Sequence, residues 1–231
     1  MNENLIFKLV NWDCLLEMQN IESNSIDCII TDPPYKILWN GFKARGWFLW
    51  ERWVITDIEN MKDGFDFKIL EEFFRVCKKA NFYIYCNKDL LFDLIVYFKN
   101  RPEKLFIDLL TEHITNPTPF CNNTFLNDTD YILYIRESWV MVRWSYHQKK
   151  KYEIKSTNTE DKKLWKHPTC KYVKFIEKYI TNSSNEWEVI LDPFMWSWTT
   201  WIACKNLNRW FIWIELNKEY FKVAENRILN N

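Results

Sequence analysis

Short apolar runs alternate with amphipathic segments along most of the chain. In the segment 66–79, apolar residues recur three or four positions apart, which predicts a helix with one apolar face. Runs such as 81–86 are short and rich in aromatic and β-branched residues, which predicts buried strands. The predicted strands are 5–10, 26–31, 81–86, 105–110, 131–136, 188–191 and 210–215, and the other predicted helices are 89–99, 170–181, 199–207 and 217–229. This alternation predicts an α/β fold, with a mostly parallel seven-stranded sheet and helices on both faces.

Two regions break the alternation. Residues 36–65 are rich in tryptophan and charge, and residues 137–168 include the stretch HQKKKYEIKSTNTEDKK, which has no apolar period. Both regions are interpreted as loops or small insertions beside the sheet, within a single domain that spans residues 1–231.

The stretch ILDPFMWSWTTWIACK, residues 190–205, has the layout of a ligand loop between a strand and a helix. Such loops favour glycine, because only glycine turns tightly, takes positive φ and lets a ligand approach the backbone. Here Trp196, Trp198 and Trp201 stand at the positions where glycine is expected.

Composition points the same way. The chain has 14 tryptophans and 3 glycines in 231 residues. Both residue types together make up about 7%, the usual share of glycine alone. We therefore hypothesise that most or all of these tryptophans are glycines in the native protein, as happens when a UGA codon that encodes glycine is translated as tryptophan. The alternative is that the indoles are real and belong to a core or a stacking surface.

The remaining composition excludes several classes of protein. Lys plus Arg and Asp plus Glu both number 31, so no global field attracts nucleic acid, and such contacts must be local. Seven cysteines without a CxxC pair argue against a disulfide framework and a zinc cluster, so we expect no metal and a cytoplasmic protein with reduced thiols. We identify neither a signal peptide nor an apolar run long enough to cross a bilayer.

The sequence TDPPY directly follows the predicted strand 26–31. Consecutive prolines end the ladder of backbone hydrogen bonds, because proline has no N–H. The carboxylate of Asp32, the carbonyl of Pro33 and the ring of Tyr35 therefore lie together at the carboxyl end of a strand, where α/β sheets bind ligands. They suit a planar amine, since Asp32 and the carbonyl can accept its two hydrogens while Tyr35 stacks on its ring. Taken alone, the tetrapeptide could equally be an ordinary turn.

Together, the two motifs resemble those of the DNA amino-methyltransferases that use S-adenosylmethionine, in the permuted class where the catalytic motif precedes the cofactor motif. Residues 32–35 match the family's [DNS]-P-P-[YFW], and residues 192–199 match D-P-F-x-G-x-G-T with tryptophan at both glycines. HPTCK at 167–171 is similar to H-P-T-x-K, and WDCL at 12–15 is similar to G-D-C-L. Every mismatch with a family glycine is a tryptophan, which supports the miscoding hypothesis. The resemblance covers nearly the whole chain and implies a Rossmann-like methyltransferase fold.

The resemblance also implies the roles of the matched residues. The expected catalytic residues are Asp32, Pro33, Pro34 and Tyr35, which would receive the amine of a base flipped from the duplex. Glu215 follows the last predicted strand, where a carboxylate takes ribose hydroxyls in this kind of sheet; a helix N-terminal carboxylate is the alternative. The expected residues for S-adenosylmethionine are Asp13, His167, Thr169, Lys171, Asp192, Phe194, Trp196, Ser197, Trp198, Thr199 and Glu215.

Double-stranded DNA is the expected partner, and its contacts must be local. The basic stretch RWSYHQKKKYEIK offers phosphate contacts and stacking rings, although a charge run is often only a solvated face. The stretch ITNPTPFCNNTF is similar to a segment that follows the catalytic strands in phage-type members of the family, and this resemblance implies that Asn116 and Pro117 line the target-base pocket. The two irregular regions are the candidate target-recognition regions, because the chain leaves little room for a separate domain. The expected DNA-binding residues are Asn116, Arg143, Lys149, Lys150 and Lys151.

The favoured function is a site-specific DNA methyltransferase that modifies the N6 amine of adenine. Asp at the first position of the catalytic motif favours adenine over cytosine. Cytosine-N4 methylation is the close alternative, because both reactions methylate an exocyclic amine. If the tryptophans are real, a silent relative that binds nucleic acid or a partner becomes the better interpretation, since indoles would fill the cofactor's volume. A nucleotide-phosphate site at Thr199 and Thr200 is disfavoured, because no lysine follows the loop. A homodimer and a cognate restriction nuclease stay open.

Overall fold

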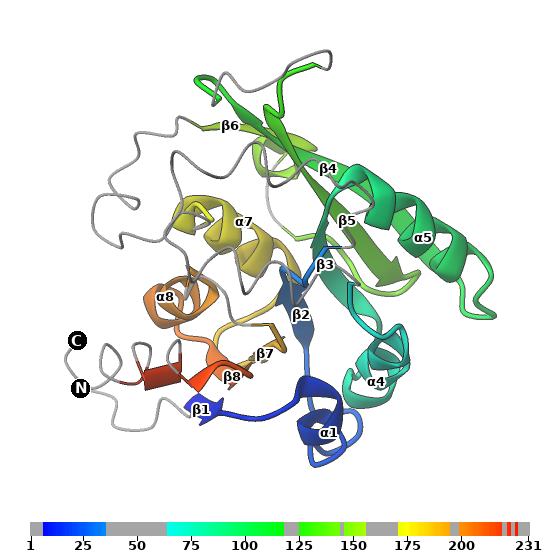
Figure 1. The fold of residues 1–231 in the computed structure, drawn as a ribbon, viewed down its shortest axis with the longest axis vertical. Coiled ribbons are helices and arrows are strands. Elements are labelled where there is room, and N and C mark those ends of the chain that lie inside the picture. The colour runs from blue at the N-terminus through cyan, green and yellow to red at the C-terminus, as the bar shows by residue number, and fades with distance from the viewer. Residues whose placement is uncertain are drawn as a thin grey trace.

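A computed structural model describes most of the chain, and its described residues form an eight-stranded sheet in the order β1-β8-β7-β2-β3-β5-β4-β6 (Figure 1). Within this sheet, β5 is antiparallel to β3 and β4, and every other described pair is parallel. The strands are β1 Phe7–Val10, β2 Cys28–Thr31, β3 Asn81–Cys86, β4 Leu105–Ile114, β5 Thr129–Glu137, β6 Tyr152–Lys155, β7 Val189–Asp192 and β8 Trp210–Ile214.

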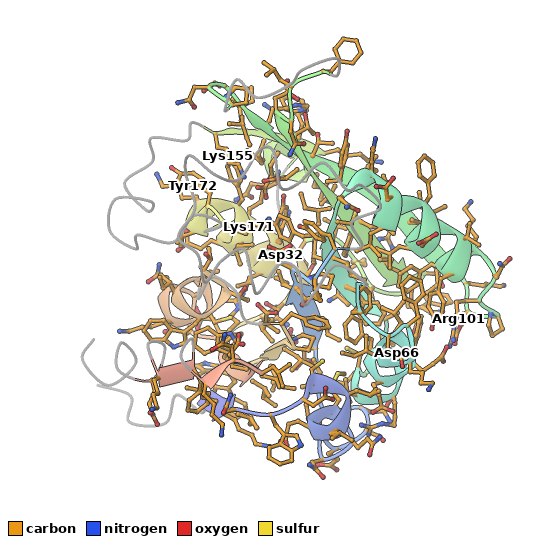
Figure 2. All side chains as sticks on the ribbon, in the orientation of Figure 1. Asp32, Asp66, Arg101, Lys155, Lys171 and Tyr172 are labelled. Carbon is orange, nitrogen blue, oxygen red and sulfur yellow. The ribbon has the colours of Figure 1, made fainter. Side chains whose placement is uncertain are left out.

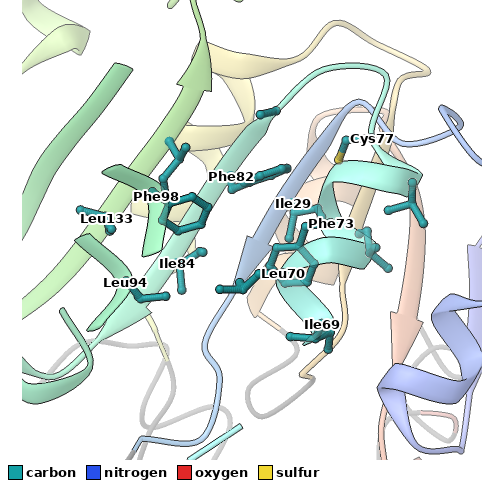
Figure 3. Close-up of a cluster of buried hydrophobic side chains, with 14 of the residues drawn as sticks. Ile29, Ile69, Leu70, Phe73, Cys77, Phe82, Ile84, Leu94, Phe98 and Leu133 are labelled. Atoms are coloured by element: carbon teal, nitrogen blue, oxygen red, sulfur yellow. The ribbon is translucent and has the colours of Figure 1, made fainter. Parts of the chain in front are cut away.

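Helices cover both faces of the sheet, as predicted, because neighbouring side chains of a strand point to opposite faces. Ile29 of β2 packs in a core with α1, α4 and α5, whereas Cys28 and Ile30 pack in a second core with α7 and α8. Figure 3 shows the first core, where Phe73 of α4 lies against Ile29 and Phe82. The helices are α1 Cys14–Met18, α4 Lys68–Val76, α5 Lys88–Lys99, α7 Val173–Ser183 and α8 Thr199–Asn206, with a 3-10 turn η1 at Tyr146–Lys149.

The predicted fold class is confirmed, but the predicted strand count of seven is wrong. The eighth strand, β6, lies inside the region 137–168 that was predicted to be irregular. The strand β6 has only four residues, which alternate between exposed and half-buried. This alternation is too short to be detected among the surrounding charged residues. The five-residue helix α1 was also missed, because its single turn is set by the Asp13 side chain that caps it.

Several predictions fall outside the residues that the structure describes. The predicted cofactor residues His167, Thr169, Trp196, Ser197 and Trp198 are among them, as are most of the candidate recognition region 36–65 and most of the predicted helix 217–229. The described residues are 7–35, 64–117, 125–143, 146–155, 171–194 and 199–218, together with 221, 222 and 225. Within them, no helix has the length and apolar character needed to cross a membrane.

Three tryptophans lie where an indole is costly. Trp187 has a φ of 69°, in the left-handed region that favours glycine and costs other residues about 1–2 kcal/mol. The indole nitrogens of Trp210 and Trp213 are buried without a hydrogen-bond partner in the described structure, which costs about 1–3 kcal/mol each. In contrast, Trp201 packs against Trp213 with ring centroids 6.4 Å apart. A glycine would adopt the backbone geometry of Trp187 without this cost. The hypothesis that the tryptophans are glycines in the native protein stays a prediction at every position.

Candidate active site

Four carboxylates follow four adjacent strands. The strands β1, β8, β7 and β2 are parallel neighbours, so their carboxyl ends meet at one edge of the sheet. Asp13, Glu215, Asp192 and Asp32 stand at or just beyond these ends. Ligands of α/β sheets bind at this edge, so the structure brings together the predicted catalytic and cofactor motifs, which are 160 residues apart in sequence at Asp32 and Asp192.

Asp32 directly follows β2 and is bound by two side chains, of which Figure 2 labels Lys171. The Tyr35 hydroxyl donates a hydrogen bond to Asp32 Oδ1, and Lys171 Nζ lies 3.1 Å from Asp32 Oδ2. Burial and the Asp32 charge raise the pKa of the Tyr35 hydroxyl well above its ordinary value, so this group stays a hydrogen-bond donor. Burial alone would lower the pKa of the Lys171 ammonium, but Asp32 and other neighbouring acidic groups hold it well above its ordinary value.

Asp192 joins β2, β7 and α8. Its Oδ1 accepts hydrogen bonds from Thr31 Oγ1 at 3.0 Å and from the backbone N–H of Phe194 at 3.2 Å, and its Oδ2 accepts one from Thr200 Oγ1 at 3.0 Å. All three donors belong to the protein itself, so Asp192 positions the start of the loop that follows β7. A contact between Asp192 and a cofactor stays a prediction. Burial raises the pKa of the Asp192 carboxyl to about 7, against the three hydrogen bonds, which lower it.

Replacing Asp192 by asparagine is expected to flatten the pH dependence of stability. A carboxyl whose pKa is higher in the folded chain than its ordinary 3.8 holds its proton more tightly when folded. Its contribution to the free energy of unfolding is therefore largest below about pH 4 and is lost as the pH rises through about 7. Thermal unfolding of wild type and Asp192→Asn across this range checks the prediction, with the exposed Asp93→Asn on α5 as control. An equal pH slope in wild type and Asp192→Asn would contradict it.

Glu215 and Asp13 lie side by side at the ends of β8 and β1. The backbone N–H of Glu215 donates to Val10 O at 2.9 Å, and that of Trp12 donates to Glu215 O at 3.1 Å. The half-buried Glu215 carboxylate accepts a hydrogen bond of 2.6 Å from the N–H of Asn217. Asp13 caps α1 by accepting the N–H of Leu16 at 3.1 Å. Both carboxylates thus stand at the edge where α/β sheets take the hydroxyls of a ribose.

Sequence reasoning missed the residues on the sheet that surround Lys171. Its ammonium lies 4.4 Å from the centre of the Tyr85 ring, and the Tyr85 hydroxyl donates to Glu112 Oε1 at 2.6 Å. Glu112 on β4 is fully buried and also binds Lys155 of β6 at 3.0 Å. Glu112 lies beyond the predicted strand 105–110, between the polar residues Thr111 and His113, so the local sequence gives no sign that it is buried. Its burial depends on strand pairing that the sequence does not reveal.

The predicted DNA-binding residues lie on two parts of the molecule. Asn116 is exposed just beyond β4, at the same edge of the sheet as Asp32. Lys149 and Lys150 are exposed just before β6, and Lys151 forms an ion pair with Asp108. Arg143 is half-buried, and its backbone N–H binds Asn182 O of α7 at 2.8 Å. The structure therefore keeps the three lysines together on an edge of the sheet, and both their segment and Arg143 contact α7, because Asn182 also donates a hydrogen bond to Gln148 O at 3.1 Å.

Comparison with known proteins identifies relatives over nearly the whole chain. A family model described as DNA methylase, N6_N4_Mtase, matches residues 26–226. The Type II methyltransferase M.HpaI of Haemophilus parainfluenzae is 30% identical over 248 aligned residues, which cover 96% of this chain and 74% of M.HpaI.

Two solved structures share the fold. The crystal structure of the M1.HpyAVI–SAM complex aligns with a TM-score of 0.68 at 23% identity, covering 96% of this chain and 100% of that chain. The cytosine-N4-specific PvuII DNA methyltransferase aligns with a TM-score of 0.71 at 14% identity, covering 98% of this chain and 87% of that chain. These likenesses confirm the predicted Rossmann-like methyltransferase fold.

Proposed function

Because the chain belongs to the DNA methylase family whose model matches residues 26–226, we propose that it transfers a methyl group from S-adenosylmethionine to the N6 amine of adenine in DNA. The observation that carries the proposal is the geometry of Asp32, which Lys171 and Tyr35 hold at the carboxyl end of β2, beside the strand that ends in Asp192. Among the structural relatives, M1.HpyAVI was solved with the same cofactor.

The described residues fit S-adenosylmethionine. Glu215 offers a carboxylate for the ribose hydroxyls, and its bond from the N–H of Asn217 fixes its orientation. Phe194 is a half-buried ring directly after β7, suited to pack against the adenosine or the methionine part. Thr199 begins α8, whose N-terminal amides favour a carboxylate such as that of methionine. When bound, the cofactor supplies an electrophilic methyl group on a sulfonium.

The catalytic motif prepares the amine. The Asp32 carboxylate and the Pro33 carbonyl accept its two hydrogens, which favours a tetrahedral nitrogen whose lone pair is free to attack. Tyr35 stacks on the base that carries the amine. Holding the amine nitrogen in line with the methyl group supplies much of the rate acceleration of methyl transfer, and no covalent bond to the protein is needed. The proton that the amine loses leaves by way of Asp32 or solvent.

The target base has to leave the duplex before it reaches Asp32, at a cost of a few kcal/mol. Asn116 stands at the edge of the sheet that holds Asp32, where it can line the pocket for this base. The lysines at 149–151 offer phosphate contacts that keep the duplex in register without reading sequence. A Type II relative favours a role in restriction and modification beside a cognate nuclease.

Product analysis tests the choice of base. DNA incubated with the wild-type chain and S-adenosylmethionine is digested to nucleosides, and N6-methyladenine is the expected product. N4-methylcytosine alone would replace the proposal with its closest alternative, which the likeness to the cytosine-N4-specific PvuII enzyme keeps open. No methylated nucleoside at all, with DNA and cofactor both bound, would favour a silent relative.

The codons of the source gene decide what the wild-type chain is. UGA at five tryptophan positions would make the native loop DPFMGSGTTG, and the assays would use the glycine chain. UGG would mean that the indoles are real, and the chain is then expected to bind S-adenosylmethionine poorly, which calorimetry measures. The positions to read are Trp12, Trp196, Trp198, Trp201 and Trp213.

A further inference from the structure

The family resemblance assigns Lys171 to the S-adenosylmethionine site, which does not account for where its side chain lies. The side chain is only 11% exposed, and its ammonium lies 3.1 Å from Asp32 Oδ2 and over the face of Tyr85. Figure 2 shows Lys171 and Asp32 close together near the end of β2. The described contacts of the ammonium are therefore with the catalytic motif and the sheet.

A second layer holds this arrangement in place. Tyr85 can present its ring to Lys171 because its hydroxyl is bound by Glu112, 2.6 Å away. Glu112 is completely buried and accepts a further hydrogen bond from Tyr179 of α7 at 3.2 Å, while Lys155 balances its charge at 3.0 Å. A paired buried network of this kind is rigid, because breaking any member leaves a buried charge or polar group without its partner in a site of low dielectric constant.

The two oxygens of Asp32 are held differently. Oδ2 faces a cation that is nearly buried, whereas Oδ1 accepts the neutral hydroxyl of Tyr35. The carboxylate is charged in both contacts, but only Lys171 carries an opposite charge that adds Coulomb attraction, so the neutral hydroxyl is the partner that an incoming amine displaces more easily. Displacement also frees Tyr35 to turn its ring toward the base.

We propose that Lys171 is a positioning residue that anchors Oδ2 of Asp32, so that Oδ1 receives the target amine when the Tyr35 hydroxyl leaves it. The inference rests on the proposed function and deepens it. Lys171 also connects the two halves of the site through its backbone, because its carbonyl accepts a hydrogen bond from Thr199 Oγ1 at 3.3 Å. The residue that fixes the amine acceptor is thereby tied to the helix that begins the cofactor site.

The test compares Lys171→Met with the wild-type chain in steady-state methyl transfer, together with the Kd for S-adenosylmethionine. Methionine keeps the length of the side chain and removes its charge. We expect kcat to fall about 10- to 100-fold, the range for a lost charge-assisted contact, while the Kd for S-adenosylmethionine changes less than about threefold. Lys171→Arg, which restores the cation, is expected to recover most of the lost kcat.

Lys178 provides the matched control. Its side chain is 14% exposed and pairs with Glu153, so it resembles Lys171 in burial and pairing but lies on α7 beside β6. Lys178→Met is expected to change stability without changing kcat. Tyr85→Phe keeps the ring beneath Lys171 and removes its bond to Glu112, and we expect it to lower kcat about three- to tenfold with cofactor affinity unchanged. This variant and Lys171→Arg carry the test if Lys171→Met does not fold.

Two results would overturn the inference. An unchanged kcat with a much weaker Kd for S-adenosylmethionine in Lys171→Met would make Lys171 a cofactor ligand, as the family resemblance implies. Equal losses of kcat in Lys171→Met and Lys178→Met would reduce its role to stability. A wild-type chain that binds cofactor and DNA but transfers no methyl group would overturn the proposed function itself.

Discussion

Asp32→Ala is expected to lower kcat for methyl transfer at least about 100-fold, because the amine loses its carboxylate acceptor. The Kd for S-adenosylmethionine should stay within about threefold of wild type, since Asp32 follows β2, whereas the groups proposed above to hold the cofactor, Phe194, Thr199 and Glu215, lie on or directly after β7, α8 and β8. The variant is also expected to be less stable, because Lys171 keeps a nearly buried charge without its partner. Radiolabelled methyl transfer and calorimetry measure the two effects separately.

Asp66→Ala is the control for this variant. Asp66 lies at the start of α4, accepts a hydrogen bond from the N–H of Lys68 at 2.9 Å and has a side chain that is 54% exposed (Figure 2). Its loss removes a carboxylate of the same kind whose described contacts are with Lys68, so the rate should not change. A rate for Asp32→Ala that matches Asp66→Ala would refute the catalytic role of Asp32.

Phe82→Ala is expected to cause the largest loss of stability, about 3–5 kcal/mol, the range for removing a buried aromatic ring. Phe82 lies on β3 and is fully buried, with its ring 5.6 Å from Phe73 and 5.3 Å from Phe74 (Figure 3). The cavity would open between α4, α5 and the sheet, where neighbouring rings cannot close it without leaving their rotamers. Urea denaturation measures the change in the free energy of unfolding.

Phe92→Ala is the matched control, because it removes the same ring from the outer face of α5, where it is 68% exposed. Its expected cost is within about 0.5 kcal/mol, as for other surface substitutions. Similar losses in both variants would mean that the packing around Phe82 does not stabilise the fold.

Local patterns were enough to predict the elements that have a long or fully apolar signal. The run 81–86 became β3, with all six residues buried, and the period in 66–79 became α4, with Ile69, Phe73 and Val76 buried. Elements without such a signal were missed. A strand as short as β6 is decided by pairing with β4, and that pairing is a contact between segments about 40 residues apart, as in Thr111 with Tyr152.

The site divides in the same way. The motifs TDPPY and DPF could be recognised in the sequence, because each places its chemical groups close together: a carboxylate, a carbonyl and a ring within four residues. The side chains that bind their carboxylates could not be predicted from the sequence. Asp192 is bound by Thr31, and Asp32 by Lys171, over 161 and 139 residues of chain.

The sequence by itself thus determined the fold class, the motifs and the family, because strand and helix periods and short motifs depend on residues close together in the chain. Tertiary structure alone decided that Lys171 binds Asp32 and that Glu112 supports it through Tyr85. A buried charge is stable only where the fold brings a partner to it, and the identity of that partner depends on the order and register of the strands.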